Sequence, residues 1–289
     1  MSVAKLGSLK VGSGWHVAVM GVINLSEDSF FSGSIVKSDE ALLRAEKMVE
    51  EGADILDIGA MATGPTSAPV PPEKEKKMLV PAVRRICSEL DVPISVDTQR
   101  ADVAEEAISN GASAVNDVTG LKEYSRMADI VGRTGSSLVV MASRKLPGDV
   151  LGMEEIIAEL RKSLAVCRSH GIPLSRVVVD PGVGHWPGRL ALLRERKGKP
   201  GKLSPATLHD IQILLNLRRM RSLGRPICVG ISRKSFVGEI LGGRPPEGRL
   251  HGSLAATAIA VLNGANLIRT HDVRETVDAV RVAEAIANA

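Results

Sequence analysis

The sequence contains few aromatic residues: three Phe, two Trp and one Tyr among 289 residues. Ala, Val, Ile and Leu must therefore build the core. Short runs of branched aliphatic residues are typical of strands that are buried on both faces of a parallel sheet. The net charge is only +4, and the basic residues form no stripe interleaved with aromatics. We therefore expect no nucleic-acid partner, and an anionic small substrate explains the positive excess equally well.

Cysteines are also few, and their spacing excludes the common metal-binding and redox motifs. Cys87, Cys167 and Cys228 lie far apart among apolar neighbours and form no CxxC pair, so we expect them to be buried and reduced. No apolar run reaches the ~20 residues that a membrane helix needs. The first residues also lack the pattern of a signal peptide. We expect a cytoplasmic protein that makes no contact with a membrane.

Short apolar runs alternate with helical patterns along the chain. Strands are expected at residues 16–24, 53–59, 93–98, 112–117, 136–142, 176–182, 226–232 and 265–272. Helices are expected at 39–52, 73–90, 101–111, 122–134, 153–170, 205–223, from Phe236, at 249–264 and at 273–287, and a basic loop at 187–204. Such alternation indicates βαβ units and a parallel sheet.

Eight strand–helix units in 289 residues predict an α/β fold with a single (β/α)8 TIM barrel. One domain is expected over residues 1–289, with the barrel proper at about 16–287. An open, doubly wound sheet is the alternative. No glycine-rich dinucleotide fingerprint follows the first strand, and the GxxxxGK[ST] phosphate loop is absent.

Polar and charged residues end the predicted strands, where the active site of such a barrel lies. Asp, Asn and Ser in these places often cap the next helix, and Asp272 is expected to cap the last one. Capping does not require Lys or Arg. A functional ring is therefore predicted from Asp97, Asn116, Asp180, Lys234, Arg269 and His271; Asn24, Asp57 and Met141 also stand at strand ends.

The residues of this ring suggest two chemical groups. Asp97, Asn116, Asp180 and Lys234 suit a flat heterocycle with an amino-pyrimidinone edge, because a carboxylate can accept two parallel N–H bonds. Asn24, Thr63, Arg269 and His271 suit a phosphate or pyrophosphate, with Asn24 as an oxygen ligand to Mg2+.

The chain resembles the dihydropteroate synthase family of pterin-binding barrels over roughly residues 17–285. The motifs that carry the resemblance are "MGVINLSEDSF" (20–30), "GADILDIGA" (52–60), "PISVDT" (93–98), "NDVTGL" (116–121), "VVVDPGVG" (177–184), "VGISRKSFVG" (229–238) and "RLHGSLAATAIAVLNGANLIRTHDV" (249–273). The resemblance implies transfer of an arylamine onto 6-hydroxymethyl-7,8-dihydropterin diphosphate with release of pyrophosphate, dependence on Mg2+, and a homodimer.

The resemblance also implies roles for single residues. The pterin-binding residues are then Asp97, Asn116, Met141, Asp180 and Lys234. The pyrophosphate group comprises Asn24, which also binds the metal, with Thr63, Arg269 and His271. Ser235, Thr63 and Pro65 are implied near the arylamine, and Asp97, Lys234, Arg269 and His271 in catalysis.

The sequence departs from the family pattern on the arylamine side. The loop "GAMATGPTSAP" (59–69) has Gly64 where the family has arginine. The segments "VGHWPGR" (183–189) and "VVMASRKLPG" (139–148) also differ from it. The acceptor is therefore either p-aminobenzoate or an arylamine carrying a ribose phosphate, as in methanopterin biosynthesis, and residues 187–204 are predicted to bind that phosphate. A pterin-dependent methyltransferase and a catalytically weak pterin-binding protein are the alternatives.

Overall fold

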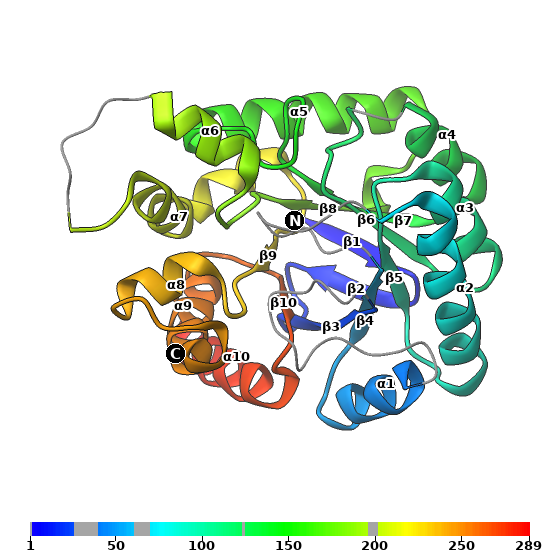
Figure 1. Ribbon diagram of the computed structural model, residues 1–289, viewed down its shortest axis with the longest axis horizontal. Coiled ribbons are helices and arrows are strands. Elements are labelled where there is room, and N and C mark those ends of the chain that lie inside the picture. The colour runs from blue at the N-terminus through cyan, green and yellow to red at the C-terminus, as the bar shows by residue number, and fades with distance from the viewer. Residues whose placement is uncertain (1, 26–39, 61–69, 123–124, 196–201) are drawn as a thin grey trace.

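The protein folds as an eight-stranded parallel barrel surrounded by helices, as predicted (Figure 1). The computed structural model describes residues 2–25, 40–60, 70–122, 125–195 and 202–289. The barrel strands are β3 (Ala18–Asn24), β4 (Ile55–Gly59), β5 (Ile94–Asp97), β6 (Ala114–Asp117), β7 (Ser137–Met141), β8 (Val177–Asp180), β9 (Cys228–Gly230) and β10 (Leu267–Thr270). Their order in the sheet is β8-β7-β6-β5-β4-β3-β10-β9. A parallel bridge between Val179 and Ile227 joins the two outer strands and closes the ring.

The helices lie outside the strands and cover the barrel (Figure 1). They are α1 (Ala41–Glu50), α2 (Pro72–Glu89), α3 (Ala101–Ser109), α4 (Ser125–Thr134), α5 (Gly152–Ser169), α6 (Pro187–Glu195), α7 (Pro205–Leu215), α8 (Ser235–Ile240), α9 (Leu250–Leu262) and α10 (Val273–Ala287). Short 3-10 helices are η2 (Leu174–Arg176), η3 (Leu217–Leu223) and η4 (Pro246–Arg249). None of the described helices is both long and apolar enough to cross a membrane.

Two apolar layers follow from the alternation of side chains along each strand. On β10, Leu267 belongs to a cluster inside the barrel, whereas Ile268 packs in the larger cluster between strands and helices. The inner cluster also contains Met20 of β3 and Val178 of β8. Every second residue of a strand therefore points into the barrel, and the alternation continues to the strand ends.

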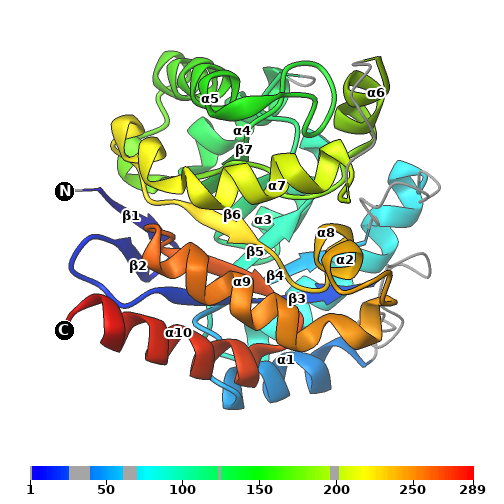
Figure 2. The same ribbon diagram turned by 90° about the vertical axis from the view of Figure 1, so that its left-hand side faces the viewer.

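A hairpin that the sequence did not reveal closes one end of the barrel. Its strands are β1 (Val3–Leu6) and β2 (Leu9–Gly12), which pair in antiparallel fashion. Leu6 and Val11 are fully buried in the inner cluster. Figure 2 shows the hairpin, together with both chain termini, at the left-hand end of the barrel. Because it packs under the amino ends of the strands, the hairpin leaves the opposite end for a site.

Three other sequence-based expectations were wrong. The segment 187–204 was predicted to be a loop, but its first part is helix α6. The helix expected at 205–223 is divided into α7 and η3 at Asn216. Asp272 occupies the N-cap position of α10, but its side chain makes no capping hydrogen bond, because it forms an ion pair with Arg233 at 2.7 Å.

The cysteines form no disulfide, as expected. Cys167 and Cys228 are buried, but Cys87 is only half-buried, so the expectation that all three are buried is wrong for Cys87. Burial raises the pKa of the Cys167 thiol to about 12.

Candidate active site

The predicted ring residues meet at the carboxyl ends of the strands. Asn24 on β3 lies in register with Gly59, Gly59 with Asp97, and Asp97 with Asn116. Met141 on β7 lies in register with Asp180 on β8. Counted in steps of two along each strand, Asn24, Asp97, Asn116 and Asp180 fall on the same side as the residues of the inner apolar cluster, so they point into the barrel. The interior of the barrel therefore changes from apolar to polar toward this end.

A compact ionic network, which we call the Arg269 network, links four strands in this layer. The guanidinium of Arg269 donates through Nε to Asp57 Oδ2 at 2.6 Å and through Nη2 to Asp97 Oδ2 at 2.7 Å. The Asn116 amide donates to the same oxygen of Asp57 at 3.0 Å. Asp57 is fully buried, and its second oxygen, Oδ1, has no hydrogen-bond partner. Asp57 stood at a predicted strand end, but no role was predicted for it.

Burial is the largest single influence on the pKa values of Asp97 and Arg269 in this network. Burial raises the pKa of Asp97 to about 7, against the opposing effect of the Arg269 charge, and the carboxylates of Asp57, Glu75 and Asp117 raise it further. Burial alone would lower the pKa of Arg269, but the charges of Asp57 and Asp97 outweigh it and hold that pKa above its ordinary value. Arg269 is therefore a permanent cation, whereas Asp97 changes charge near neutral pH.

A second pair, Asp180 and Lys234, lies at the ends of β8 and β9. Asp180 Oδ1 accepts the Gly182 N–H at 2.6 Å. The Lys234 ammonium donates to the Val183 carbonyl and lies 5.6 Å from the centre of the Trp186 ring. Burial raises the pKa of Asp180 and lowers that of Lys234, while each charge opposes the shift of the other. Carboxylate and ammonium thus stabilise each other in a desolvated place.

His271 follows Arg269 by two residues and bonds through Nδ1 with the Ser232 hydroxyl at 3.0 Å. Arg44 of α1 donates to the His271 carbonyl at 3.4 Å. Burial and the Arg269 charge lower the pKa of His271 to about 3. The imidazole is therefore neutral at pH 7 in the described structure, and Arg269 supplies the positive charge at this place. A bound anion would raise this pKa again.

The remaining predicted residues take different places. Met141 is buried beside Gly182, in register with Asp180. Ser235 is the half-buried first residue of α8, directly after Lys234. Thr63 and Pro65, with Gly64 between them, lie outside the described residues. Asp117 has the opposite parity to Asn116, and its side chain accepts the N–H groups of Thr119 and Leu121, which shapes the turn after β6.

Two loops beside the site, 142–149 and 182–186, pack directly on each other. A Cβ atom at Gly148 would lie only 2.3 Å from the Trp186 ring, so glycine is required for this approach. Trp186 Nε1 donates to the Gly182 carbonyl at 3.0 Å. The two segments that depart most from the family pattern here therefore form one unit beside Lys234.

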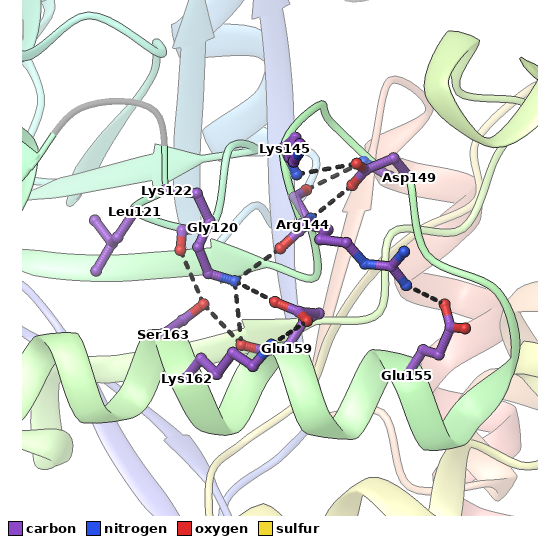
Figure 3. A network of polar contacts seen from close by, with 12 residues as sticks. Gly120, Leu121, Lys122, Arg144, Lys145, Asp149, Glu155, Glu159, Lys162 and Ser163 are labelled. Atoms are coloured by element: carbon purple, nitrogen blue, oxygen red, sulfur yellow. Dashed lines mark hydrogen bonds and ion pairs between the residues drawn. The ribbon is translucent and has the colours of Figure 1, made fainter. Parts of the chain in front are cut away.

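A network of polar contacts connects the loop 142–149 to Lys122 and to helix α5 (Figure 3). Lys122 Nζ donates to the Ser143 carbonyl at 2.8 Å and pairs with Glu159 Oε2 at 2.7 Å. Asp149 accepts the N–H groups of Arg144 and Lys145. The loop after β7 is thus tied to helix α5 through Lys122 and Glu159.

The described residues contain no group of three or more His, Cys, Asp or Glu side chains that could hold a metal ion. Mg2+ often uses only one or two protein oxygens and takes its other ligands from substrate phosphates and water. Asn24 supplies one half-buried amide oxygen at the end of β3, a donor of the type that Mg2+ accepts. A single oxygen of this kind is compatible with a magnesium ion that takes its other ligands from a substrate and water.

Comparison with known proteins identifies the relatives of this chain. A model of the pterin binding enzyme family matches residues 20–271. The chain is 32% identical to a dihydropteroate synthase of Bacillus subtilis, over 93% of this chain and 88% of that protein. It is 34% identical to a dihydropteroate synthase of Escherichia coli, over 95% and 93% of the two chains.

Solved structures agree with these relatives. The fold matches a dihydropteroate synthase from Coxiella burnetii in complex with pteroic acid, with a TM-score of 0.83, 33% identity and 99% coverage of both chains. A dihydropteroate synthase from Xanthomonas albilineans with 4-aminobenzoic acid matches with a TM-score of 0.79 and 33% identity, over 95% of this chain and 94% of that one.

Proposed function

Because the chain belongs to the pterin-binding enzyme family, we propose that it is a transferase that joins p-aminobenzoate to 6-hydroxymethyl-7,8-dihydropterin diphosphate and releases pyrophosphate. The observation that carries the proposal is the polar inward layer at the strand ends, in which Arg269, Asp57, Asp97 and Asn116 form one network. Asp180 and Lys234 border the same layer. The folate-type reaction needs these groups for binding and orientation more than for proton transfer.

The pterin-binding part of the site consists of Asp97, Asn116, Asp180, Lys234 and Met141. An aminopyrimidinone edge presents parallel N–H donors, which a carboxylate accepts with both oxygens. Asp180 Oδ1 accepts the Gly182 N–H, and since each carboxylate oxygen has two lone pairs, both oxygens can still accept from the ring. The negative charge of this part also favours positive charge that develops on the pterin methylene carbon during transfer.

The leaving-group part consists of Asn24, Arg269 and His271, with Thr63 as a further member from the sequence. The Arg269 guanidinium has a rigid fork of donors that matches phosphate oxygens. Asn24 would help to hold a Mg2+ ion that binds with the diphosphate, and this ion would neutralise charge on the leaving group. Little acid–base help is required, because pyrophosphate is a good leaving group, and orientation of the two substrates provides much of the rate.

What supports p-aminobenzoate over a phosphorylated arylamine is the position of Arg189. This residue belongs to the basic segment 187–204, but it is fully buried in an ion pair with Asp210. Arg194 and Lys202 are exposed, and Arg196, Lys197 and Lys199 lie outside the described residues.

Ser235, Thr63 and Pro65 are the residues that we assign to the acceptor. We also propose a cytoplasmic homodimer, which light scattering of the purified protein tests.

The testing experiment follows pyrophosphate release from the pterin diphosphate with p-aminobenzoate or its ribosyl-phosphate derivative, with and without Mg2+. We expect release only when p-aminobenzoate and Mg2+ are both present, and dihydropteroate as the product. Preference for the phosphorylated acceptor would replace the acceptor assignment. Tight pterin binding without turnover would show a catalytically weak binding protein, and methyl transfer from a methylated pterin would favour the methyltransferase alternative.

A further inference from the structure

A buried arginine outside the predicted ring of strand-end residues contacts the loop beside Lys234. The side chain of Arg189, in the first turn of α6, is 0% exposed. Its Nη1 donates to the carbonyl of Gly182 at 2.8 Å and to that of Gly184 at 2.7 Å. It also bonds to Asp210 Oδ1 at 3.2 Å, and Nε reaches the Val150 carbonyl at 3.4 Å. A guanidinium buried so fully is tolerated only with such partners.

These partners belong to three segments that are far apart in the sequence. Val150 precedes α5, Gly182 and Gly184 follow β8, and Asp210 lies in the middle of α7. Asp210 is also 0% exposed, and its Oδ1 accepts the Gly184 N–H at 2.9 Å. Arg189 and Asp210 therefore hold the carbonyl and the N–H of Gly184 from two sides. We call this set of contacts the Arg189 clamp.

The clamped loop forms the surroundings of the Lys234 side chain. The Lys234 ammonium donates to the carbonyl of Val183, the residue between the two clamped glycines. A Cβ atom at Gly184 would lie 3.2 Å from Lys234 Nζ, so the backbone passes close to the ammonium. The Trp186 ring lies 5.6 Å from it and is tied to the Gly182 carbonyl, which Arg189 also contacts. A displacement of residues 182–186 would therefore displace Lys234.

We propose that Arg189 is a positioning residue that, together with Asp210, fixes the loop 182–186 and thereby sets the place of the Lys234 ammonium at the site. For pterin affinity the inference rests on the proposed function, but for the position of Lys234 it does not. Arg189 itself touches no assigned substrate group. An ion pair with a purely structural role would contribute to stability and leave the position of Lys234 unchanged.

The test uses three variants of the full-length protein. Arg189→Met removes the donors, Arg189→Lys keeps the charge without the planar fork, and Arg189→Met/Asp210→Asn avoids leaving an uncompensated buried carboxylate. The control is Arg176→Met, which also removes a half-buried cation that donates to a backbone carbonyl, that of Gly135, but lies before β8 at the end of the barrel away from Lys234. Circular dichroism identifies the variants that fold.

The first readout is the titration of Lys234, obtained by mass spectrometry from the pH dependence of its acylation. Burial holds the pKa of Lys234 below its ordinary value. The Arg189 charge also lowers the pKa of Lys234 directly, so the charge-conserving Arg189→Lys variant is decisive. In this variant, if folded, we expect the pKa of Lys234 to rise by about one unit, comparable to the usual spread among protein lysines, and in Arg176→Met to stay unchanged. An unchanged Lys234 titration in folded Arg189→Lys would overturn the inference.

The second readout is affinity for pteroic acid, measured by calorimetry in a double-mutant cycle. Arg189→Met should weaken binding about tenfold, as expected when one charge-assisted hydrogen bond is lost, but should have no further effect in a Lys234→Met background. Equal losses in both backgrounds would show that Arg189 does not act through Lys234. If the wild-type protein binds no pterin, the proposed function fails, while the Lys234 titration still decides the positioning claim.

Discussion

Arg269 joins two buried carboxylates on different strands, which makes it both a candidate binding group and a structural one. Sequence reasoning alone predicts that Arg269→Ala impairs use of the diphosphate and spares the unphosphorylated pterin. The ion pairs change this expectation, since removal of the guanidinium leaves Asp57 and Asp97 without their cation. We expect a loss of roughly 3–5 kcal/mol in the free energy of unfolding, and weaker binding of both pterin forms. Urea denaturation and calorimetry measure these effects.

Arg133→Ala is the matched control for this variant, since Arg133 pairs with Glu105 on the surface and its side chain is 64% exposed. Exposed pairs contribute little, so this change should leave stability and binding nearly as they are. If Arg269→Ala is as stable as the control and still binds the unphosphorylated pterin normally, the original division of the site into two independent parts is correct.

Asp180 provides the sharpest test of the pterin-binding part. Asp180→Asn keeps the side-chain size and one oxygen, but it replaces the second acceptor with an amide donor. We expect a loss of roughly 1.5–3 kcal/mol in pterin binding, the scale of a hydrogen bond to a charged group. Calorimetry with pteroic acid gives the value, and unchanged affinity would remove Asp180 from the pterin site.

Asp97 predicts how binding depends on pH. Its pKa is raised to about 7, so the carboxyl is largely protonated below that pH and ionised above it. Only the ionised form offers both oxygens to N–H donors of the pterin. Pterin affinity should therefore rise between pH 6 and pH 8, and Asp97→Asn should bind more weakly with a flatter profile. A pH profile that is identical in the wild type and the variant would exclude Asp97 as the titrating group.

At the level of elements, the hairpin β1–β2 closes the barrel at the end away from the site. Leu6 is fully buried among interior side chains of the barrel strands. Leu6→Ala should lower the free energy of unfolding by about 2–5 kcal/mol and leave the Michaelis constants unchanged. Lys5→Ala, an exposed change on the same strand, is the control. A large change in substrate affinity without loss of stability would mean that the hairpin reaches the site.

The elements could be predicted where their periodicity was long and apolar. All eight barrel strands were found because each is a short buried run that is followed by a helical pattern. The hairpin was missed because its strands have only four residues each and a mixed composition. Helix α6 was missed because its basic residues indicated a solvated loop. The fully buried Arg189 on this helix is a tertiary effect that composition cannot show.

At the level of the whole molecule, closure of the barrel brings distant strand ends into one layer. Asp97, Asn116, Asp180, Arg269 and His271 could be predicted, since they end strands in a fold whose sites lie at that end. Because side chains alternate along a strand, Asn116 points into the barrel and Asp117 points out of it. Asp57 points into the barrel like Asn116 and was still missed, because its role depends on Arg269, which lies 212 residues later in the chain. The contact between Asp57 and Arg269 exists only because closure of the barrel brings β4 and β10 to the same end, and the sequence does not show this register.

The central claim is that this inward polar layer binds the pterin. The most direct measurement is a crystal structure of the protein with pteroic acid, supported by calorimetry of the same complex. The account predicts the pterin ring at the ends of β5, β6 and β8, with its nitrogen edge on Asp180 and Asn116 and the Lys234 ammonium beside it. A ring bound elsewhere, or no binding at concentrations that saturate a related dihydropteroate synthase, would contradict the account.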